Sequence, residues 1–146
     1  MEGSRMMIAD FGMACTNAEA RKGDTRADMV STKDYRAPEL LQKGNKCVTF
    51  GAEIDVWSAC ATAYDCASFG NPRGPRIYMM QYWMEQEVID MKEARDMALR
   101  RLTWDDSVLR TFLEECARWP LNRPSADICL HSLTNRCKEM VGKPIA

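Results

Sequence analysis

The chain has 146 residues, a length typical of one domain, and its 46% hydrophobic residues are enough to build a packed core. Its 20 basic and 21 acidic residues give a net charge of −1, which argues against a dedicated surface for nucleic acid or for acidic membranes. Because no apolar run suggests a membrane span or a signal peptide, we expect a protein that is cytoplasmic or otherwise intracellular.

The first part of the chain predicts little regular structure. Residues 5–9 are apolar after Arg5 and lead to a glycine turn, which predicts a short strand. Residues 13–36 are polar, carry mixed charge and show no sustained period, so we expect a long, mobile loop. Residues 37–44 predict a short helix that a glycine ends.

Helices are predicted for the remainder. Residues 51–70 carry apolar or small side chains on every side, which is typical of a buried helix. Residues 71–76 contain the chain break "NPRGPR". Residues 78–102 carry apolar side chains at helical spacing, and their Met-rich face either belongs to the core or forms a partner groove.

Two further helices follow near the C-terminus. One has a predicted start within residues 103–106, and the other starts at Pro124 and Ser125 and stops before Gly142 and Pro144. The fold class is therefore mostly α, with at most a vestige of strand.

The cysteines give no sign of a metal site. There are seven, no two with C-x-x-C spacing, and His131 is the only histidine. We expect reduced thiols that are mostly buried as small hydrophobic side chains.

Asp10, Phe11 and Gly12 form the first motif that carries chemistry. A carboxylate after a strand can hold Mg²⁺ against nucleotide phosphates. The phenylalanine would pack into the core, and the glycine would let the chain turn. By itself the tripeptide is equally consistent with a surface turn that buries an aromatic ring.

Three more motifs follow in order, namely "YRAPELL" from Tyr35, "FGAEIDVWS" from Phe50 and "CARWPLNRPSADICL" from Cys116. With these four motifs the chain resembles the serine/threonine protein kinase family, in the style of the branch of cyclin-dependent and MAP kinases. The resemblance covers about residues 7–141 but only the C-terminal half of the family domain.

The resemblance implies a fold and a division of the chain. Residues 1–146 would be a partial kinase domain, a C-terminal lobe with a long activation loop and a buried central helix. Residues 10–39 would be the activation segment between the DFG and APE motifs, and residues 51–142 the helical subdomain.

The resemblance also implies roles for single residues. Asp10 would bind Mg²⁺ and, through it, ATP. Glu39 and Arg123 would form a partly buried ion pair, Asp55 would accept backbone N–H groups of the catalytic loop, and Trp57 would anchor the buried helix. The remaining matched positions are structural, and they are Phe11, Gly12 and Arg36. His131, in the last helix, would be a packing residue and not a metal ligand or a base.

Four of the hydroxyl groups in the predicted activation loop are candidates for a functional role, and they belong to Thr25, Ser31, Thr32 and Tyr35. Thr32 matches the threonine that positions the substrate hydroxyl in the family. Phosphate on Thr25, Ser31, Thr32 or Tyr35 would pair with arginines and order the loop. For Thr25, an ordinary polar loop residue is an equally good interpretation.

The sequence contains no G-x-G-x-x-G loop, no V-A-I-K lysine and no H-R-D-x-x-x-x-N catalytic loop. Phosphoryl transfer depends on those groups, so we assign no catalytic residue and expect the isolated chain to be inactive, although the family uses Mg²⁺ and ATP. We also expect marginal stability, because the helix at residues 51–70 would lose a packing partner.

Three functional hypotheses stay open. The chain is a kinase fragment that works with a protein substrate and with a partner covering the missing half. Alternatively, it is a non-catalytic docking or scaffold module that binds proteins through the Met-rich helix. Finally, it is a small helical protein that carries the motifs by accident. None involves nucleic acid or a membrane.

Overall fold

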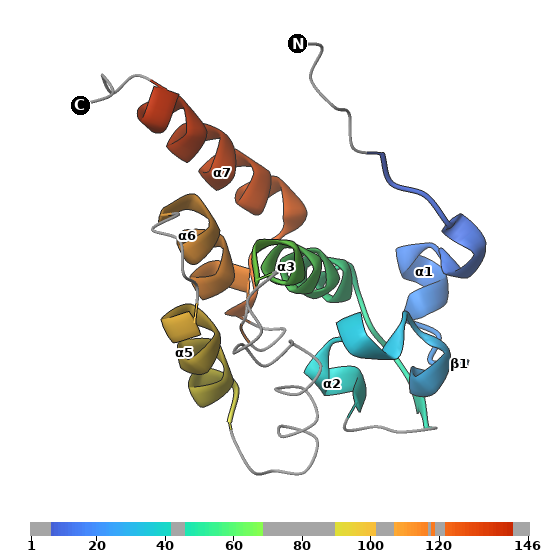
Figure 1. Cartoon of the computed structure of the whole chain (residues 1–146). Coiled ribbons are helices and arrows are strands. Elements are labelled where there is room, and N and C mark those ends of the chain that lie inside the picture. Colours follow the sequence, from blue (N-terminus) through green and yellow to red (C-terminus); the bar gives the residue numbers. More distant parts are fainter. Residues whose placement is uncertain are drawn as a thin grey trace.

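The computed structural model describes residues 7–41, 46–68, 90–101, 107–116, 118 and 122–141 (Figure 1). In chain order, its elements are the 3₁₀ helix η1 (Phe11–Met13), α1 (Asn17–Ala20), β1 (Thr25–Arg26), the 3₁₀ helices η2 (Ala27–Met29) and η3 (Lys33–Tyr35), α2 (Pro38–Leu41), β2 (Cys47–Val48), α3 (Glu53–Ser68), α5 (Met91–Arg101), α6 (Ser107–Cys116) and α7 (Ala126–Val141). The prediction of a mostly helical fold is confirmed. Across these described ranges, no helix has the length and apolar character needed to cross a membrane.

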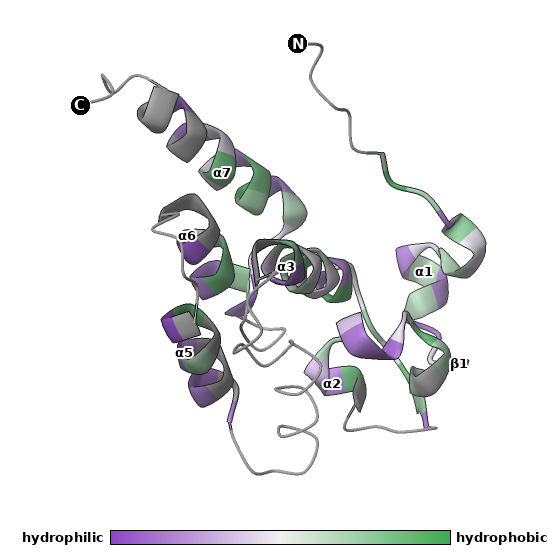
Figure 2. Ribbon diagram, in the orientation of Figure 1, coloured by the Kyte–Doolittle hydropathy of each residue, from purple (hydrophilic) through white to green (hydrophobic). Residues whose placement is uncertain are grey.

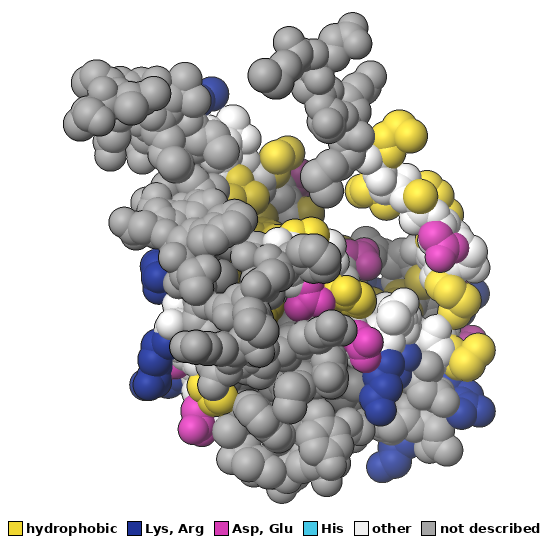
Figure 3. Space-filling model, viewed as in Figure 1, with side chains coloured by type: hydrophobic (Ala, Val, Ile, Leu, Met, Phe, Trp, Pro, Cys, Tyr) yellow, Lys and Arg dark blue, Asp and Glu magenta, His cyan; other side chains and the backbone are white. Residues whose placement is uncertain are grey.

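The predicted strand at residues 5–9 is wrong over residues 7–9. These residues have no regular structure, and the side chains of Met7 and Ile8 are both 86% exposed. A strand requires a neighbour for its backbone groups, and among the described residues β1 and β2 pair only with each other. Figure 3 shows the hydrophobic side chains of this N-terminal segment on the surface at the upper right.

Residues 13–36 contain more regular structure than predicted. The Thr16 hydroxyl accepts a hydrogen bond from the Glu19 N–H, and the Glu19 carboxylate accepts one from the Thr16 N–H, so a capping box starts α1. β1 then pairs antiparallel with β2, with Thr25 opposite Val48. One local capping box and the pairing with one distant strand therefore give regular structure to parts of a segment that has no hydrophobic period. Its mobility stays a prediction.

α3 is the central element, and it lies between the α6–α7 pair and the N-terminal half of the chain (Figure 1). The buried side chains that α3 contributes to the core are Ile54, Val56, Trp57, Cys60, Ala61 and Tyr64. The predicted helix is confirmed, but its burial on every side is wrong. One line of small or acidic residues, three or four apart, is exposed, and it consists of Asp55, Ala59, Thr62 and Cys66.

The C-terminal helices pack as a layer against α3. α6 contacts α3, α5 and α7, and it buries Leu113 and Cys116. Figure 2 shows hydrophilic and hydrophobic residues along all three helices, as expected when one side of a helix faces a core. The predicted start of α7 is confirmed, because the Ser125 hydroxyl accepts the Ile128 N–H at 3.4 Å.

Several predictions fall outside the described residues. They concern the break at residues 71–76, the N-terminal part of the helix predicted from residue 78, the helix start within residues 103–106, and the stop signals Gly142 and Pro144. The described part of the predicted Met-rich helix is α5, in which Met97 and Leu99 pack against the core. Neither side chain belongs to the predicted Met-rich face, so whether that face is part of the core or a partner groove stays a prediction.

Candidate functional site

Arg123 lies between α6 and α7 and reaches across the molecule to α2. Its Nη1 atom is 2.8 Å from Glu39 Oε1, and its Nη2 atom is 3.2 Å from Glu39 Oε2. The two side chains are 84 residues apart in sequence. The Arg123 side chain is fully buried and that of Glu39 is 19% exposed, so water screens this ion pair little. The contact predicted from the sequence is present.

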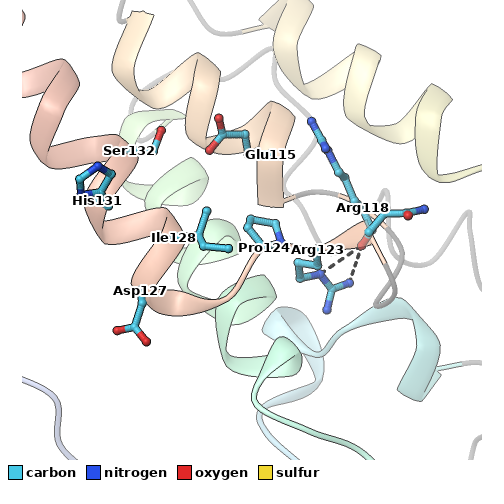
Figure 4. Close-up of a pocket in the computed structure, with 9 residues that line it drawn as sticks. Glu115, Arg118, Arg123, Pro124, Asp127, Ile128, His131 and Ser132 are labelled. Carbon is cyan, nitrogen blue, oxygen red and sulfur yellow. Dashed lines mark hydrogen bonds between the residues drawn. The ribbon is translucent and has the colours of Figure 1, made fainter.

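The remaining donors of Arg123 bind backbone carbonyl groups. Nη1 also donates to the Glu53 carbonyl at 2.7 Å, while Nε and Nη2 donate to the Arg118 carbonyl at 3.1 and 2.6 Å (Figure 4). One guanidinium group therefore joins α2, the start of α3 and the segment that precedes α7. Only arginine offers five donors in a rigid, planar group, so lysine cannot reproduce this arrangement.

The indole ring of Trp57 packs against the Arg123 guanidinium group. The Arg123 guanidinium lies 5.3 Å from the centre of the indole ring, within the range of a cation–π interaction. The ring is buried, and its Nε1 atom has no hydrogen-bond partner among the described residues. The predicted burial of Trp57 is confirmed, and its packing under a cation is a feature that the sequence did not indicate.

Asp55 is exposed at the start of α3. Partial desolvation by the surrounding protein, and secondarily the Glu53 carboxylate, raise the pKa of its carboxyl group. The backbone donors that the resemblance implies for Asp55 belong to a loop that the printed sequence lacks. Its role in holding that loop stays a prediction.

The Asp10-Phe11-Gly12 turn has an unusual backbone. Asp10 has φ 62° and ψ 64°, the left-handed region, which aspartate tolerates better than most residues. Phe11 then begins η1, which closes with a hydrogen bond from the Ala14 N–H to the Phe11 carbonyl. The prediction that Phe11 packs into the core is wrong, since its side chain is 69% exposed. No described segment covers this turn, so the ring finds no core to enter.

Asp10 has no cluster of further metal-ligating side chains around it among the described residues. Asp10 is exposed, and within the described ranges no group of three or more His, Cys, Asp or Glu side chains is placed to hold a metal ion. Because Mg²⁺ requires several oxygen ligands in octahedral geometry, Asp10 supplies at most one of them. The metal-binding role of Asp10 stays a prediction.

Arg36 fixes the turn that presents two of the predicted loop hydroxyls. It is buried, and its Nε and Nη2 atoms donate to the Val30 and Ser31 carbonyls at 2.7 and 2.8 Å. Ser31 has a positive φ of 57°, and both Ser31 and Thr32 are exposed. Thr25, by contrast, is half-buried in β1. Ser31 and Thr32 are thus the more accessible of these three hydroxyl groups.

Tyr35 is tied to α3 by its side chain and its backbone. Its hydroxyl group forms a hydrogen bond with Asp65, and this bond, together with the Asp65 charge, raises the pKa of the phenol. Its carbonyl accepts a hydrogen bond from Ser58 Oγ at 3.0 Å. Sequence reasoning missed Ser58 and Asp65. The only signal was an acidic residue in an otherwise small and apolar stretch of a helix.

A surface pocket of about 680 Å³ lies where α6 ends and α7 begins (Figure 4). Its lining mixes charges of both signs with the apolar side chains of Pro124 and Ile128. His131 is at this pocket and is exposed, with its Nε2 atom 3.0 Å from Asn135 Nδ2. The expectation that His131 is a packing residue is therefore wrong. The position of a histidine in the sequence does not show whether its side chain is buried or lies on the surface, where it can bond to a residue one helical turn away.

Three cysteines meet in the core between α3, α6 and α7, and they are Cys60, Cys116 and Cys129. The Sγ atoms of Cys116 and Cys129 are 3.5 Å apart. Burial raises the pKa of Cys60 to about 12 and raises that of Cys116 as well. Cys15, Cys47 and Cys66 are exposed, so the expectation of mostly buried thiols holds for three of the six cysteines whose side chains the structure describes.

Comparisons with known proteins agree with the arrangement of these motifs. Residues 1–133 match the model of the protein kinase domain family. The chain is 34% identical to Mitogen-activated protein kinase 4a of Physcomitrium patens over 96 residues, which cover 66% of this chain and 24% of that protein. It is 33% identical to Mitogen-activated protein kinase 6 of Oryza sativa subsp. japonica over 116 residues, which cover 79% of this chain and 28% of that protein. The aligned stretches thus span about a quarter of these relatives, and no solved structure matches.

Proposed function

The chain belongs to the protein kinase domain family, and from this premise we propose that it is the C-terminal lobe of a serine/threonine protein kinase domain. Residues 10–39 are its activation segment, and residues 51–142 are its helical subdomain. Within a complete domain, this lobe takes part in ATP-dependent transfer of a phosphoryl group to serine or threonine hydroxyls of a protein substrate.

One observation carries the proposal. Three of the four kinase-like motifs meet at the Arg123 guanidinium, because Glu39 belongs to the "APE" motif, Trp57 to "DVWS" and Arg123 to "NRPS". A chance occurrence of the motifs would not bring three of them together around one buried cation. The match of the family model over most of the chain supports the same interpretation.

We assign the isolated chain no catalytic activity. Transfer requires a lysine on the phosphates, an aspartate that orients the acceptor hydroxyl and a second metal ligand, and the sequence has no motif that supplies them. In the complete domain, Asp10 is the residue of this chain that binds Mg²⁺. The partner that completes the site is the other half of a kinase domain.

A chimeric kinase tests this function. The chain replaces the corresponding region of Mitogen-activated protein kinase 4a of Physcomitrium patens, and transfer of labelled phosphate to a serine-rich test protein is measured. We expect transfer by the folded chimera and none by the 146-residue chain. Asp10→Asn in the chimera should abolish transfer. The matched control is Asp24→Asn, an exposed aspartate of the same segment outside the motif.

Two results would contradict the proposal. Transfer by the 146-residue chain itself would refute its inactivity in isolation. A chimera that gives the circular dichroism spectrum and cooperative unfolding of a folded protein, yet transfers no phosphate, would refute its role as a kinase lobe.

A further inference from the structure

Two buried thiols meet where α6 packs against α7. Cys116 is the last residue of α6, Cys129 lies in the first turn of α7, and their Sγ atoms are 3.5 Å apart. We propose that this pair is an oxidation site, at which a peroxide converts the two thiols into a disulfide bridge that joins α6 to α7. The site is independent of the proposed kinase function, because neither cysteine is assigned a part in phosphoryl transfer.

The distance between the two sulfur atoms suits a bridge. A disulfide bond is about 2.0 Å long, so each sulfur atom has to move by less than about 1 Å, which rotation of the side chains can supply. The thiols are already in contact, and one donates a hydrogen bond to the other. Cys60 of α3 belongs to the same buried cluster and is therefore the competing partner that an experiment has to exclude.

The oxidant also needs access to the pair. Cys129 is 5% exposed and Cys116 is 0% exposed, so Cys129 meets solvent first. The pocket at the junction of α6 and α7 is lined by Glu115 and Ile128, which are the chain neighbours of the two cysteines (Figure 4). Hydrogen peroxide is small and uncharged, and it can reach Cys129 from this pocket when the first turn of α7 opens locally.

The oxidation takes two steps. The Cys129 thiolate attacks one oxygen of hydrogen peroxide, the O–O bond breaks, and the products are a sulfenic acid and hydroxide, which takes up the thiol proton and leaves as water. Cys116 then attacks the sulfenic sulfur, so that the S–S bond forms, the S–O bond breaks and a second water leaves. The two thiols lose two electrons in total, and the peroxide is reduced to two water molecules.

Contact between the thiols is what makes the second step efficient. Burial raises the pKa of Cys116, so this thiol is a poor nucleophile towards reagents in solution. Within the pair, however, the sulfenic sulfur forms beside it, and the reaction becomes intramolecular. The site should therefore form an internal bridge in preference to joining an external thiol.

The bridge would close a loop that contains the Arg123 contact. The two cysteines are 13 residues apart, and Arg118 and Arg123 both lie between them. Cross-linking a loop of this length restricts the unfolded chain and so stabilises the folded one. Oxidation should therefore raise the midpoint of thermal unfolding by about 5–10 °C.

Peptide mapping of the full chain tests the site. Reduced protein at low concentration is treated with hydrogen peroxide, remaining thiols are blocked with iodoacetamide in urea, and the peptides are analysed by mass spectrometry without reduction. Trypsin cuts after Arg118, between the two cysteines, so the bridge joins two otherwise separate peptides. We expect this bridge at least about tenfold more often than any bridge to Cys60, because proximity favours the partner already in contact.

Cys129→Ala should abolish the bridge, and Cys66→Ala is the matched control. Both variants replace a helical cysteine, but Cys66 is exposed on α3 and its loss should leave the bridge at the wild-type level. Cys60→Ala should also leave the bridge unchanged. If the Cys129 variant fails to fold, as judged by circular dichroism, the maps of the wild type and of Cys66→Ala still decide the question, since neither alters the core.

Thermal unfolding gives the second readout. The oxidised wild type should unfold about 5–10 °C above the same sample reduced with dithiothreitol, and Cys129→Ala should show no such difference. The proposal is overturned if peroxide leaves both thiols free, if Cys60 is the preferred partner of either, or if the folded chain prefers this bridge no more than the chain oxidised in urea. A bridge that leaves the midpoint unchanged would refute the stabilising link between α6 and α7.

Discussion

At the scale of single residues, Arg123 accounts for more of the tertiary structure than any other polar side chain described above. It binds a carboxylate from α2, two backbone carbonyls and the face of an indole ring. A buried ion pair of this kind is stabilising only while both partners are present, because a charge left alone in the interior keeps its desolvation cost. The largest effect of removing the guanidinium group on stability would therefore come from the partly buried, unpaired Glu39 carboxylate that remains.

Arg123→Met should lower the free energy of unfolding by about 3–5 kcal/mol, since it leaves the Glu39 carboxylate and the Glu53 and Arg118 carbonyls without their donor. Urea denaturation followed by circular dichroism measures this loss. Arg123→Lys should also destabilise, because an ammonium group cannot bind all of these oxygen atoms at once.

Arg118→Met is the control for this prediction. The Arg118 side chain is exposed, and its Nε atom binds the Glu114 carbonyl, so its loss should cost no more than about 1 kcal/mol. Equal effects of the Arg118 and Arg123 substitutions would show that the buried guanidinium contributes nothing special to stability.

At the scale of elements, the molecule depends on the packing of α6 between α3 and α7. Leu113 is 2% exposed, and it lies in the same core as Trp57 and Tyr64 of α3. α7 covers part of this layer, yet it also presents Ile128 and Leu130 to solvent. The contribution of a leucine to stability therefore depends on whether its position in the helix faces the core or the solvent.

Leu113→Ala should destabilise the fold by about 2–5 kcal/mol, the range for removing a buried leucine and leaving a cavity. Leu130→Ala should change stability by no more than about 0.5 kcal/mol, because that side chain is already 65% exposed. Both variants have the same chemistry, so urea denaturation of the pair isolates the effect of burial. A large loss for Leu130 would indicate that α7 is covered in solution.

At the scale of the whole molecule, the reactivity of the cysteines measures which parts of the folded chain are inaccessible to solvent. Cys60 and Cys66 lie on the same helix, but Cys60 is buried among three helices whereas Cys66 is exposed. Thiols react as thiolates, so burial and the raised pKa of Cys60 both make Cys60 the less reactive of the two. Unfolding removes both differences.

In the folded chain, iodoacetamide should modify Cys66 at least about tenfold faster than Cys60, as measured by mass spectrometry of peptides. Raising the pH from about 7 to about 9 should leave Cys60 unreactive, because burial raises the pKa of Cys60 to about 12. In urea the two should react alike. Equal rates without urea would mean that the core around α3 opens readily.

The same pKa has a consequence for stability. The folded state holds the Cys60 proton more tightly than the unfolded state, whose thiol has the ordinary pKa of 9.0. The favourable contribution is therefore complete below pH 9.0 and is lost as the pH rises towards 12. Alkaline destabilisation of the chain should begin in that interval.

Much of the fold and part of the site were predictable from the sequence. The position of α3 and the start of α7 follow from apolar composition and from a local cap, both of which depend on neighbouring residues along the chain. The contact between Glu39 and Arg123 followed from motifs that mark both partners. The attachment of Tyr35 to Asp65 was not predictable, because it depends on which turn of α3 faces η3.

The sequence by itself determined where most of the described helices form and which residues carry kinase-like motifs, since helix periodicity and capping are local properties of the chain. Only the tertiary structure decided which side chains are covered. Phe11, His131 and one side of α3 are exposed to solvent, against expectation. The guanidinium group of Arg123 contacts residues of two other motifs that are distant in sequence. Burial depends on what packs across from a residue, and that partner comes from a distant part of the chain.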